Sequence, residues 1–518
     1  MRKKHHANAL MLQGTHSNAG KSLIVTALCR AYARRGIHVA PFKPQNMSTN
    51  AAITREGGEI SRAQALQARA CRLEPRNVMN PLLLKPQSGH TTHIILNGAH
   101  IDTTNASTWM KRRADFLPAI LDAYQRLCKE YDLILVEGAG SPAEANLPPP
   151  DIANMAFAEA SRIPVLLIAS IDRGGVLASI TGTHLLLSPQ EQRRVKGYII
   201  NQFRGQRHLL DPAFPIIKRH TSWPCYGIVP FMDEAQHLPL EDSLSLKELL
   251  AHKEQTERQQ RQHRTKETIH IAVPLIPHLA NSDDFDPLRS DPQCQLSFVP
   301  PQHNIPPCDI IILPGSKSVI RDMQFIRQQG WDIDIYAHVR QKKHVLGLCG
   351  GYQMLGHTIE DPQGIEGIKG QIKGLGLLDV TTRLMERKIL AQSNAIHVKT
   401  QQYVHGYEIH MGITKQRQQY QTMLAPCHTE HKNKKHIDDH GTTSPCGLVE
   451  GCYLHALFAN DGFRNAYIQH ITHHRLHSNN RLQYQKALED SLDRLAHHIE
   501  QAIDLDALQK LASTQEPP

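Results

Sequence analysis

The sequence ALMLQGTHSNAGKS, residues 9–22, decides the fold of the first half of the chain. Its first four residues are apolar and strand-like, and a loop of small and polar residues follows. Residues 23–34 then carry apolar side chains three and four positions apart, the spacing of an amphipathic helix. Strand, loop and helix in this order are the context of a Walker A loop, whose backbone N–H groups curl around phosphates at a helix N-terminus. The stretch therefore predicts a nucleotide-binding α/β domain.

Within this loop, each residue type has a chemical role. Lys21 is expected to neutralise the β and γ phosphates of ATP, and Ser22 to bind Mg²⁺. The remaining ATP-binding candidates in the loop are Gly14, Thr15 and Gly20. Five residues separate Gly14 from Gly20 instead of four, a variant found in dethiobiotin-synthetase-like enzymes. The alternative is a chance Gly-Lys-Ser on a surface turn, but strand, loop and helix all lie where phosphate binding requires them.

Two acidic residues follow predicted strands in the same half of the chain. Glu137 ends the apolar run that begins at Leu133, and Asp172 follows the run 165–169. Ligands of open α/β sheets bind at the carboxyl ends of the strands, and Mg²⁺ takes one or two carboxylates together with phosphate oxygens. We expect Glu137, and secondarily Asp172, to be metal ligands; a capping carboxylate is the alternative for Glu137.

The pattern of apolar runs divides the chain into domains. Short runs alternate with helical patterns up to about Val229, and a second such pattern begins at Ile269, as expected for two α/β domains with largely parallel sheets. A highly charged stretch lies between them. The expected organisation is a P-loop domain at 1–245, a linker at 246–268, a second domain at 269–480 with an exposed insertion at 414–444, and a helical tail at 481–518.

Composition limits the classes of partner. The formal charge of +9 is dispersed, and aromatic residues are only 5% of the chain, so nothing resembles a groove for nucleic acid. No window is apolar enough for a membrane span, and the N-terminus does not resemble a signal peptide, so a cytoplasmic protein is expected. The ten cysteines follow no disulfide or zinc-ribbon spacing. Association of the chain into a homo-oligomer stays open.

The second half contains a cysteine in the context of a nucleophile. Cys349 follows the buried strand-like run 345–348 and is flanked by Gly347, Gly350 and Gly351 before a helical pattern. This is the pattern of a nucleophile elbow, in which the helix N-terminus favours the thiolate. A buried structural cysteine would not explain three neighbouring glycines. We expect Cys349 to be a catalytic nucleophile.

Two further segments complete the predicted site. Gly315 and Ser316 follow the strand-like run 310–313, and their backbone N–H groups are candidates, with that of Gly350, for an oxyanion hole. His455 closes the short run 451–455 and is the expected general base. Among 33 histidines, its position in this motif is what distinguishes it.

These residues together resemble the cobyric acid synthase family over nearly the whole chain. The passages that carry the resemblance are residues 41–47 (PFKPQNM), 58–64 (GEISRAQ), 79–86 (MNPLLLKP), 137–144 (EGAGSPAE), 172–175 (DRGG), 406–412 (GYEIHMG) and 453–455 (YLH). Lys43 in the first passage joins the ATP-binding candidates, and His410 in the sixth joins the glutamine-binding ones.

The resemblance implies a P-loop domain of the dethiobiotin-synthetase type followed by a class I glutamine amidotransferase domain. It also implies amidation of the b, d, e and g carboxylates of adenosylcobyrinic a,c-diamide, a corrinoid substrate, with ATP, Mg²⁺ and glutamine as ammonia donor. The Cys–His site of this family lacks the usual glutamate two residues after the histidine. In this sequence that position is Leu457, in agreement with the family. The group that orients His455 stays unidentified. Ser170 departs from the acidic residue often found before Ile-Asp-Arg-Gly-Gly.

Three other interpretations deserve weight. An a,c-diamide synthase also joins an ATPase half to a Cys–His amidotransferase half, but residues 43–47 favour cobyric acid synthase. A partition or septum-positioning ATPase carries an early lysine in its loop, where this chain has His16, and needs no cysteine elbow. A catalytically dead scaffold would not need Lys21, Cys349 and His455 together.

Overall fold

The computed structural model describes residues 7–48, 50–86, 91–147, 149–232, 238, 268–366, 369–417, 421–427, 441–472 and 481–514. The chain forms two compact units. The first contains the described residues of Met1–Pro86, His90–Glu241 and Leu488–Pro518, and the second those of Asp242–Ala487. All of the charged linker expected at 246–268 except its last residue, and most of the insertion expected at 414–444, lie outside the described residues.

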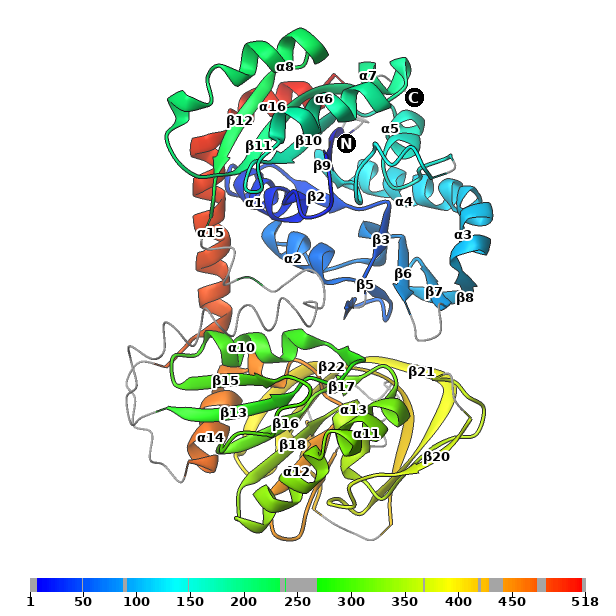
Figure 1. Ribbon diagram of the computed structural model, residues 1–518, viewed down its shortest axis with the longest axis vertical. Helices are drawn as coiled ribbons and strands as arrows, with labels where there is room; N and C mark the ends of the chain where they lie inside the picture. Colours follow the sequence, from blue (N-terminus) through cyan, green and yellow to red (C-terminus); the bar gives the residue numbers. More distant parts are fainter. Residues whose placement is uncertain are drawn as a thin grey trace. The chain divides into compact units, whose positions relative to one another are not determined.

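A six-stranded parallel sheet forms the centre of the first unit (Figure 1). Its strands, in spatial order, are β12 (Cys225–Pro230), β11 (Val195–Phe203), β10 (Val165–Ser170), β1 (Asn8–Gly14), β9 (Leu133–Glu137) and β2 (Val39–Phe42). The connecting helices are α1 (Lys21–Arg34), α4 (Leu117–Glu130), α5 (Met155–Ser161), α6 (Val176–Leu186), α7 (Pro189–Arg194) and α8 (Ala213–Thr221). Strands β1, β9 and β2 all end at one edge, where the phosphate-binding loop begins.

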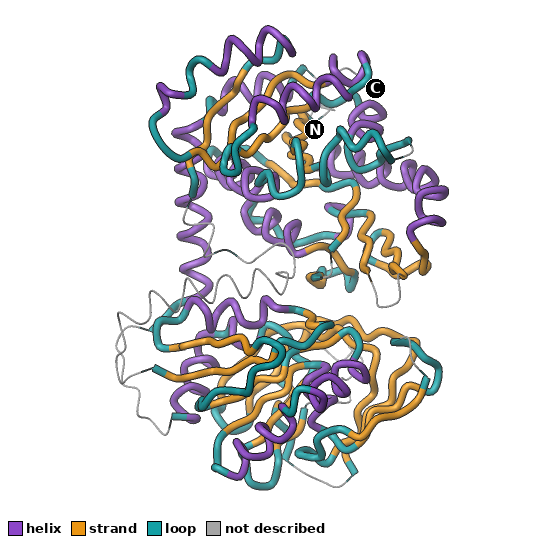
Figure 2. Tube along the Cα trace, viewed as in Figure 1, coloured by secondary structure: helices purple, strands orange, loops and turns teal. Residues whose placement is uncertain are grey.

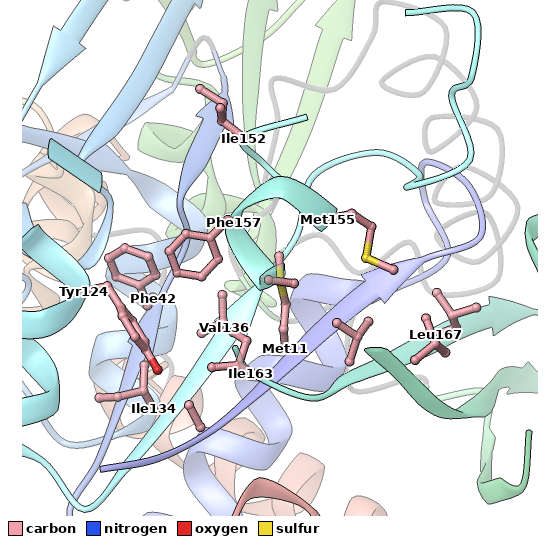
Figure 3. Close-up of a cluster of buried hydrophobic side chains, with 14 of the residues drawn as sticks. Met11, Phe42, Tyr124, Ile134, Val136, Ile152, Met155, Phe157, Ile163 and Leu167 are labelled. Atoms are coloured by element: carbon pink, nitrogen blue, oxygen red, sulfur yellow. The ribbon is translucent and has the colours of Figure 1, made fainter. Parts of the chain in front are cut away.

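Both faces of this sheet are covered, so its strands are apolar at nearly every position. In β1, Ala9 and Met11 join one buried cluster, whereas Leu10 and Leu12 join the other. The first cluster lies between the sheet and the side of α4 and α5, where Phe42, Tyr124 and Phe157 gather (Figure 3). Alternate side chains of a strand point to opposite faces, which is why continuous apolar runs marked these strands in the sequence.

A second, smaller sheet is inserted between β2 and α4. It contains β3 (Gln45–Met47), β6 (Leu82–Pro86), β7 (Thr91–Leu96) and β8 (Ala99–Asn105), with β3 parallel to β6 and the rest antiparallel. Strands β4 (Ala51–Ile53) and β5 (Glu59–Ser61) form a hairpin, followed by α2 (Arg62–Ala70), while α3 (Ala106–Arg112) follows β8. Short 3₁₀ turns occupy Asn77–Met79, Arg113–Phe116 and Arg207–Leu209. The passages at 58–64 and 79–86 fall in this region, and the passage at 41–47 runs from the end of β2 into β3.

The C-terminal helices belong to the core of the first unit. Helix α15 (Tyr484–Ala502) and helix α16 (Leu505–Ala512) contribute apolar side chains to the same buried cluster as α1. Arg30 of α1 forms ion pairs with Glu489 and Asp493 of α15, at 2.8 Å each. The tail expected at 481–518 therefore packs against a helix that lies more than four hundred residues earlier in the chain.

The second unit is built on another mainly parallel sheet, whose strands are drawn in orange in Figure 2. The strand order is β15 (Cys294–Val299), β13 (Ile269–Pro274), β16 (Ile310–Leu313), β18 (His344–Leu348), β25 (Val449–Cys452) and β24 (Thr442–Thr443), with only β24 antiparallel among these six strands. Its helices are α10 (Asp286–Ser290), α11 (Val319–Gln328), α12 (Trp331–Arg340), α13 (Gly350–Leu355) and α14 (Asp461–Ile471), with 3₁₀ turns at Ser282–Phe285 and Leu457–Ala459. The two sheets confirm the expected α/β class.

A further sheet contains β20 (Gly370–Lys373), β19 (Thr358–Asp361), β21 (Val380–His397) and β22 (Gln402–Gln416), and β23 (Leu424–Pro426) pairs with β21. The short strands β14 (Leu279–Ala280) and β17 (Gly315–Ser316) form an antiparallel ribbon. The exposed insertion expected at 414–444 stays a prediction because most of it lies outside the described residues, but its described ends belong to sheets. Residues 414–416 end β22, and Met423 and Thr442 are fully buried, because β23 and β24 pair with neighbouring strands. Within the described part of the chain, no helix combines the length and apolar character needed to cross a membrane.

Candidate active sites

The phosphate-binding loop wraps closely around Lys21. Its Nζ donates hydrogen bonds to the carbonyl oxygens of Gly140, at 3.0 Å, and His16, at 3.5 Å. A Cβ at Gly14 would lie 2.9 Å from the carbonyl oxygen of His16, so a larger residue there would force the loop backbone to shift. Gly20 is left-handed, with φ of +90°, and precedes the first residue of α1. The free N–H groups at the start of α1 therefore point into a loop that also contains the positively charged Lys21 side chain.

Glu137 is the centre of a buried polar cluster beside this loop. It is fully buried, and its Oε1 accepts hydrogen bonds from Ser22 Oγ and Lys43 Nζ, both at 2.7 Å. Its Oε2 accepts a hydrogen bond from the Gln67 amide of α2, whose own oxygen accepts one from Gln64. The structure thus brings together three of the residues predicted from the sequence, Ser22, Lys43 and Glu137. Gln67 was not predicted.

Ser22 and Glu137 suit a magnesium ion. A hydroxyl and a carboxylate in contact are ligands that Mg²⁺ accepts together with phosphate oxygens. Thr15, also predicted, has a buried hydroxyl that lacks a hydrogen-bond partner among the described residues. Oxygen donors at a loop that binds phosphate are the donor set that the metal prefers.

Asp172 does not join this cluster. The structure places it just beyond β10, where its backbone N–H is bonded to Ser170 Oγ and its carboxylate lies 3.7 Å from Arg204. Its side chain is 42% exposed. Asn201, which the sequence did not single out, supports the loop instead: its amide donates to the carbonyl of Ala19 at 2.9 Å.

In the second unit, Cys349 lies at a strained turn between β18 and α13. Its φ of +50° is unusual for a residue with a side chain, and the thiol is almost buried. A Cβ on Gly350 would lie 2.6 Å from the backbone nitrogen of Ser316, and one on Gly351 would collide with the carbonyl of Leu313. The glycines are therefore required by close backbone approach, and the strain lies at the cysteine itself.

His455 is held by a carboxylate that the sequence left unidentified. Asp284 Oδ2 accepts a hydrogen bond from His455 Nδ1 at 2.7 Å, and its Oδ1 accepts one from the N–H of Ala456 at 2.7 Å. Both His455 and Asp284 are buried. Tyr407 stacks on the imidazole, with ring centroids 5.2 Å apart.

The charge of Asp284 controls the protonation of His455. Burial alone would lower the pKa of the imidazole, but the Asp284 carboxylate and the nearby Cys349 thiol raise that pKa well above its ordinary value. The Nε2 atom is buried and has no hydrogen-bond partner among the described residues. A thiol beside such an imidazole can transfer its proton to it and become a nucleophile.

The predicted oxyanion loop lies beside these residues. Gly315 and Ser316 form β17, and a Cβ at Gly315 would lie 3.5 Å from the His455 ring. Ser316 Oγ donates to the fully buried Asp322 at 2.6 Å, and Asp322 also binds His278 Nδ1 at 2.8 Å. The hydrogen bond to Asp322 raises the pKa of His278. The backbone of Ser316 therefore lies close to Gly350, the residue that carries the other predicted donor N–H.

His410, the last predicted site residue, lies on β22 near the cysteine. Its ring stacks on Tyr453 at 3.6 Å, and its Nδ1 donates to the carbonyl of Gly412 at 2.8 Å. The carbonyl of Ile409, one residue earlier, accepts from Cys349 Sγ at 3.7 Å. The structure therefore gathers Cys349, His455, the oxyanion loop and His410 in one place.

The sequence held a partial signal for Asp284. The segment 282–286 contains three aspartates shortly after the first strand of the second domain, at the carboxyl edge where Cys349 also lies. That edge position could have marked the segment as part of a site. Nothing in the spacing could have selected one aspartate of the three.

The two domains define the class of protein: a P-loop nucleotide-binding domain joined to a glutamine amidotransferase domain. Residues 10–246 match the CobQ/CobB/MinD/ParA nucleotide binding domain, and residues 270–463 match the CobB/CobQ-like glutamine amidotransferase domain. The cobyric acid synthase of Paracoccus denitrificans (strain Pd 1222) is 46% identical over 506 residues, 97% of this chain and 99% of the relative. That of Ruegeria sp. (strain TM1040) is 45% identical over 503 residues, 97% of this chain and 98% of the relative. The chain belongs to the cobyric acid synthase family.

Proposed function

We propose that this protein is an ATP- and glutamine-dependent amide synthase of cobalamin biosynthesis. It converts the b, d, e and g carboxylates of adenosylcobyrinic a,c-diamide to carboxamides. The observation that carries the proposal is the presence, in one chain, of a strained Cys349 beside an Asp284-bound His455 and of a phosphate-binding loop beside a buried Glu137. Full-length similarity to cobyric acid synthases supports this substrate class over that of the a,c-diamide synthase.

The second unit releases ammonia from glutamine. His455 takes the thiol proton, and the Cys349 sulfur attacks the side-chain amide carbon of glutamine. The N–H groups at Ser316 and Gly350 stabilise the resulting oxyanion. His455 then gives its proton to the departing nitrogen, so ammonia leaves and a thioester forms. Water attacks the thioester, releases glutamate and restores the thiol. Asp284 keeps the imidazole in the tautomer that this exchange needs.

The first unit activates the carboxylate, which is by itself a poor electrophile. An oxygen of the substrate carboxylate attacks the γ-phosphorus of ATP, and ADP leaves with the electrons of the broken P–O bond. Ammonia then displaces phosphate from the acyl phosphate and forms the amide. Lys21 and Lys43 balance phosphate charge, and Ser22 and Glu137 would hold Mg²⁺, which neutralises phosphate charge when it is bound.

The proposal is tested by following the mass of adenosylcobyrinic a,c-diamide with ATP, Mg²⁺ and either glutamine or ammonium chloride. The wild-type protein should carry out successive amidations at the b, d, e and g positions with both nitrogen sources. Cys349→Ala should lose the reaction with glutamine and keep that with ammonium, because only the glutamine reaction needs the thiol.

The matched control is Cys446→Ala, since Cys446 is an exposed cysteine of the same unit. It should behave as the wild type with both nitrogen sources. Absence of any mass change in the wild type, together with amidation of cobyrinic acid at its a and c positions, would overturn the proposal in favour of the a,c-diamide synthase.

A further inference from the structure

Beside Cys349 lies a group of buried polar side chains that the reaction described above does not use. It consists of Gln353 on α13 and of Glu408 and His410 on β22, each less than a tenth exposed. Cys349 directly precedes α13, and the backbone N–H of Gln353 in that helix donates a hydrogen bond to the Cys349 carbonyl at 3.2 Å. Glu408 and His410 are two residues apart on a strand and share one strand face.

Helix α13 and strand β22 meet at Tyr453. The His410 ring stacks on the Tyr453 ring, and the Nε2 atom of Gln353 donates a hydrogen bond to the Tyr453 hydroxyl at 2.9 Å. A Cβ at Gly412, on the same strand face, would collide with the Gln353 amide, so helix and strand are in close contact. Because the Ile409 carbonyl also contacts the Cys349 thiol, Glu408 lies one residue from the strand position that touches the nucleophile.

Each of the three side chains presents a buried polar atom without a hydrogen-bond partner in the described structure. These atoms are Glu408 Oε2, His410 Nε2 and Gln353 Oε1. A buried carboxylate is costly unless it is paired and hydrogen-bonded. The Nε2 atom of His410 is 3.5 Å from Glu408 Oε2, beyond a normal hydrogen bond.

The hydrogen bonding of His410 makes the group more acceptor-rich. Its Nδ1 must carry a proton to donate to the Gly412 carbonyl, so a neutral ring presents a lone pair at Nε2. A carboxylate oxygen and an imidazole lone pair side by side lack a donor between them. A ligand that brings N–H groups with positive charge satisfies both.

We propose that Glu408 binds the α-ammonium group of the glutamine that Cys349 attacks, with His410 as a second acceptor. The inference rests on the proposed glutaminase activity and gives it a specificity residue. A glutamine molecule carries its only cationic group on the α-carbon, a few bonds from the amide that reacts. Glu408 therefore selects an α-amino acid amide over a simple amide of the same length.

The test compares glutamine with glutaramate, which has the same amide and carboxylate but no α-ammonium group, by ammonia release. In the wild type, kcat/KM should be much higher for glutamine. In Glu408→Gln, kcat/KM for glutamine should fall by roughly 10²-fold, mainly through KM, since a buried charge pair loses one partner. The value for glutaramate should change little, so the discrimination collapses. Glu408→Asp should recover part of it.

Three further arms separate this inference from other failures. Amidation with ammonium chloride should be unchanged in Glu408→Gln, because that reaction takes place in the first unit, and ammonia release from glutaramate at the wild-type rate would show that the second unit is folded. Glu360→Gln, on β19 of the same sheet, should keep wild-type discrimination. A wild type that releases no ammonia from glutamine would refute the proposed function itself. Equal use of glutamine and glutaramate by the wild type, or an unchanged ratio in Glu408→Gln, would overturn only the role of Glu408.

Discussion

Both carboxylate oxygens of Asp284 accept hydrogen bonds from the segment that carries His455, one from the imidazole ring and one from the backbone N–H of Ala456. The two contacts fix the position of the imidazole and its tautomer. The negative charge also counteracts burial, so it keeps the pKa of His455 raised.

Asp284→Asn should remove this charge and lower the pKa of His455. We expect glutamine-dependent amidation to fall by about 10²–10⁴-fold, the range seen when a general base loses its proper state. Ammonium-dependent amidation should be retained, and alkylation of Cys349 by iodoacetamide at pH 7 should slow. Asp286→Asn, two residues away and paired with Arg289, is the control and should leave both rates unchanged. Equal loss in the two variants would contradict a specific role for Asp284.

Single residues were predictable where their chemistry lies in a local motif. Lys21, Ser22, Cys349 and His455 each sit in a short strand-loop pattern that can be read from the sequence. Asp284 meets His455 across a separation of 171 residues, and such a contact exists only after folding. The same holds for Gln67 and Glu137, which are 70 residues apart.

Glu450 is a buried residue whose role is structural. Its Oε1 lies 3.1 Å from Lys399 Nζ and 3.5 Å from His397 Nε2. Burial raises the pKa of the carboxyl, but the nearby His397 ring and the charge of Lys399 outweigh it and lower the pKa to about 2. A folded-state pKa below the ordinary value stabilises the protein at pH values above the ordinary value.

This stabilisation should be present at neutral pH and should be lost progressively as the pH falls from about 4.5 through about 2. In Glu450→Gln, urea unfolding should show lower stability at pH 7 and a weaker loss between those pH values than in the wild type. Glu386→Gln, an exposed residue of β21, should follow the wild-type profile. A Glu450→Gln profile parallel to that of the wild type would show that Glu450 does not titrate in this way.

At the scale of elements, the oxyanion loop depends on how closely three segments approach one another. Strand β17 pairs with β14, and Lys317 N–H bonds the His278 carbonyl at 3.0 Å. Asp322, at the start of α11, fixes the Ser316 side chain. The first residue of α13, Gly350, then lies against the backbone of Ser316. The position of the donor N–H is thus set by a ribbon and two helix ends together.

Gly350→Ala should disturb this arrangement. The added Cβ would lie 2.6 Å from Ser316 N and 2.9 Å from Ser316 Cβ, so the ribbon must move away. We expect kcat with glutamine to fall by about 10²–10³-fold, as for loss of one oxyanion donor, with ammonium-dependent amidation retained. Gly182→Ala in α6, where a Cβ meets no atom within 4 Å, is the control. Wild-type kcat in Gly350→Ala would rule out a tight contact.

Elements differed in how far the sequence predicted them. Several buried parallel strands were predicted to within a residue or two, such as β9 from the run at 133–136, because covered strands are continuously apolar. Strands β21 and β22 span 18 and 15 residues and were not predicted. Their polar and apolar residues mix on an antiparallel sheet, and their pairing gives no local signal. The inserted sheet from β3 to β8 was missed for the same reason.

At the scale of the whole molecule, the C-terminal helices complete the hydrophobic core of the first unit. The sequence showed a helical tail, but helical periodicity does not say which surface the apolar face covers. In the structure, Leu488, Leu492 and Leu495 of α15 are buried with residues of α1. Tyr32 of α1 donates a hydrogen bond to the Leu505 carbonyl at 2.9 Å, and burial raises the pKa of its hydroxyl well above the ordinary value.

Leu495→Ala should therefore destabilise the P-loop unit although it lies far from the loop in sequence. Leu495 is fully buried, so the substitution should lower the free energy of unfolding by about 2–5 kcal/mol. Ammonium-dependent amidation should be lost at a lower temperature than in the wild type, because Lys21 and Glu137 lie in this unit. Glutamine hydrolysis should keep its wild-type inactivation temperature, because Cys349 and His455 lie in the second unit. Asp490→Ala, an exposed position of the same helix, should change the free energy of unfolding by less than about 0.5 kcal/mol. If hydrolysis of glutamine instead failed together with amidation in Leu495→Ala, the two units would unfold as one, and the tail would stabilise the entire chain.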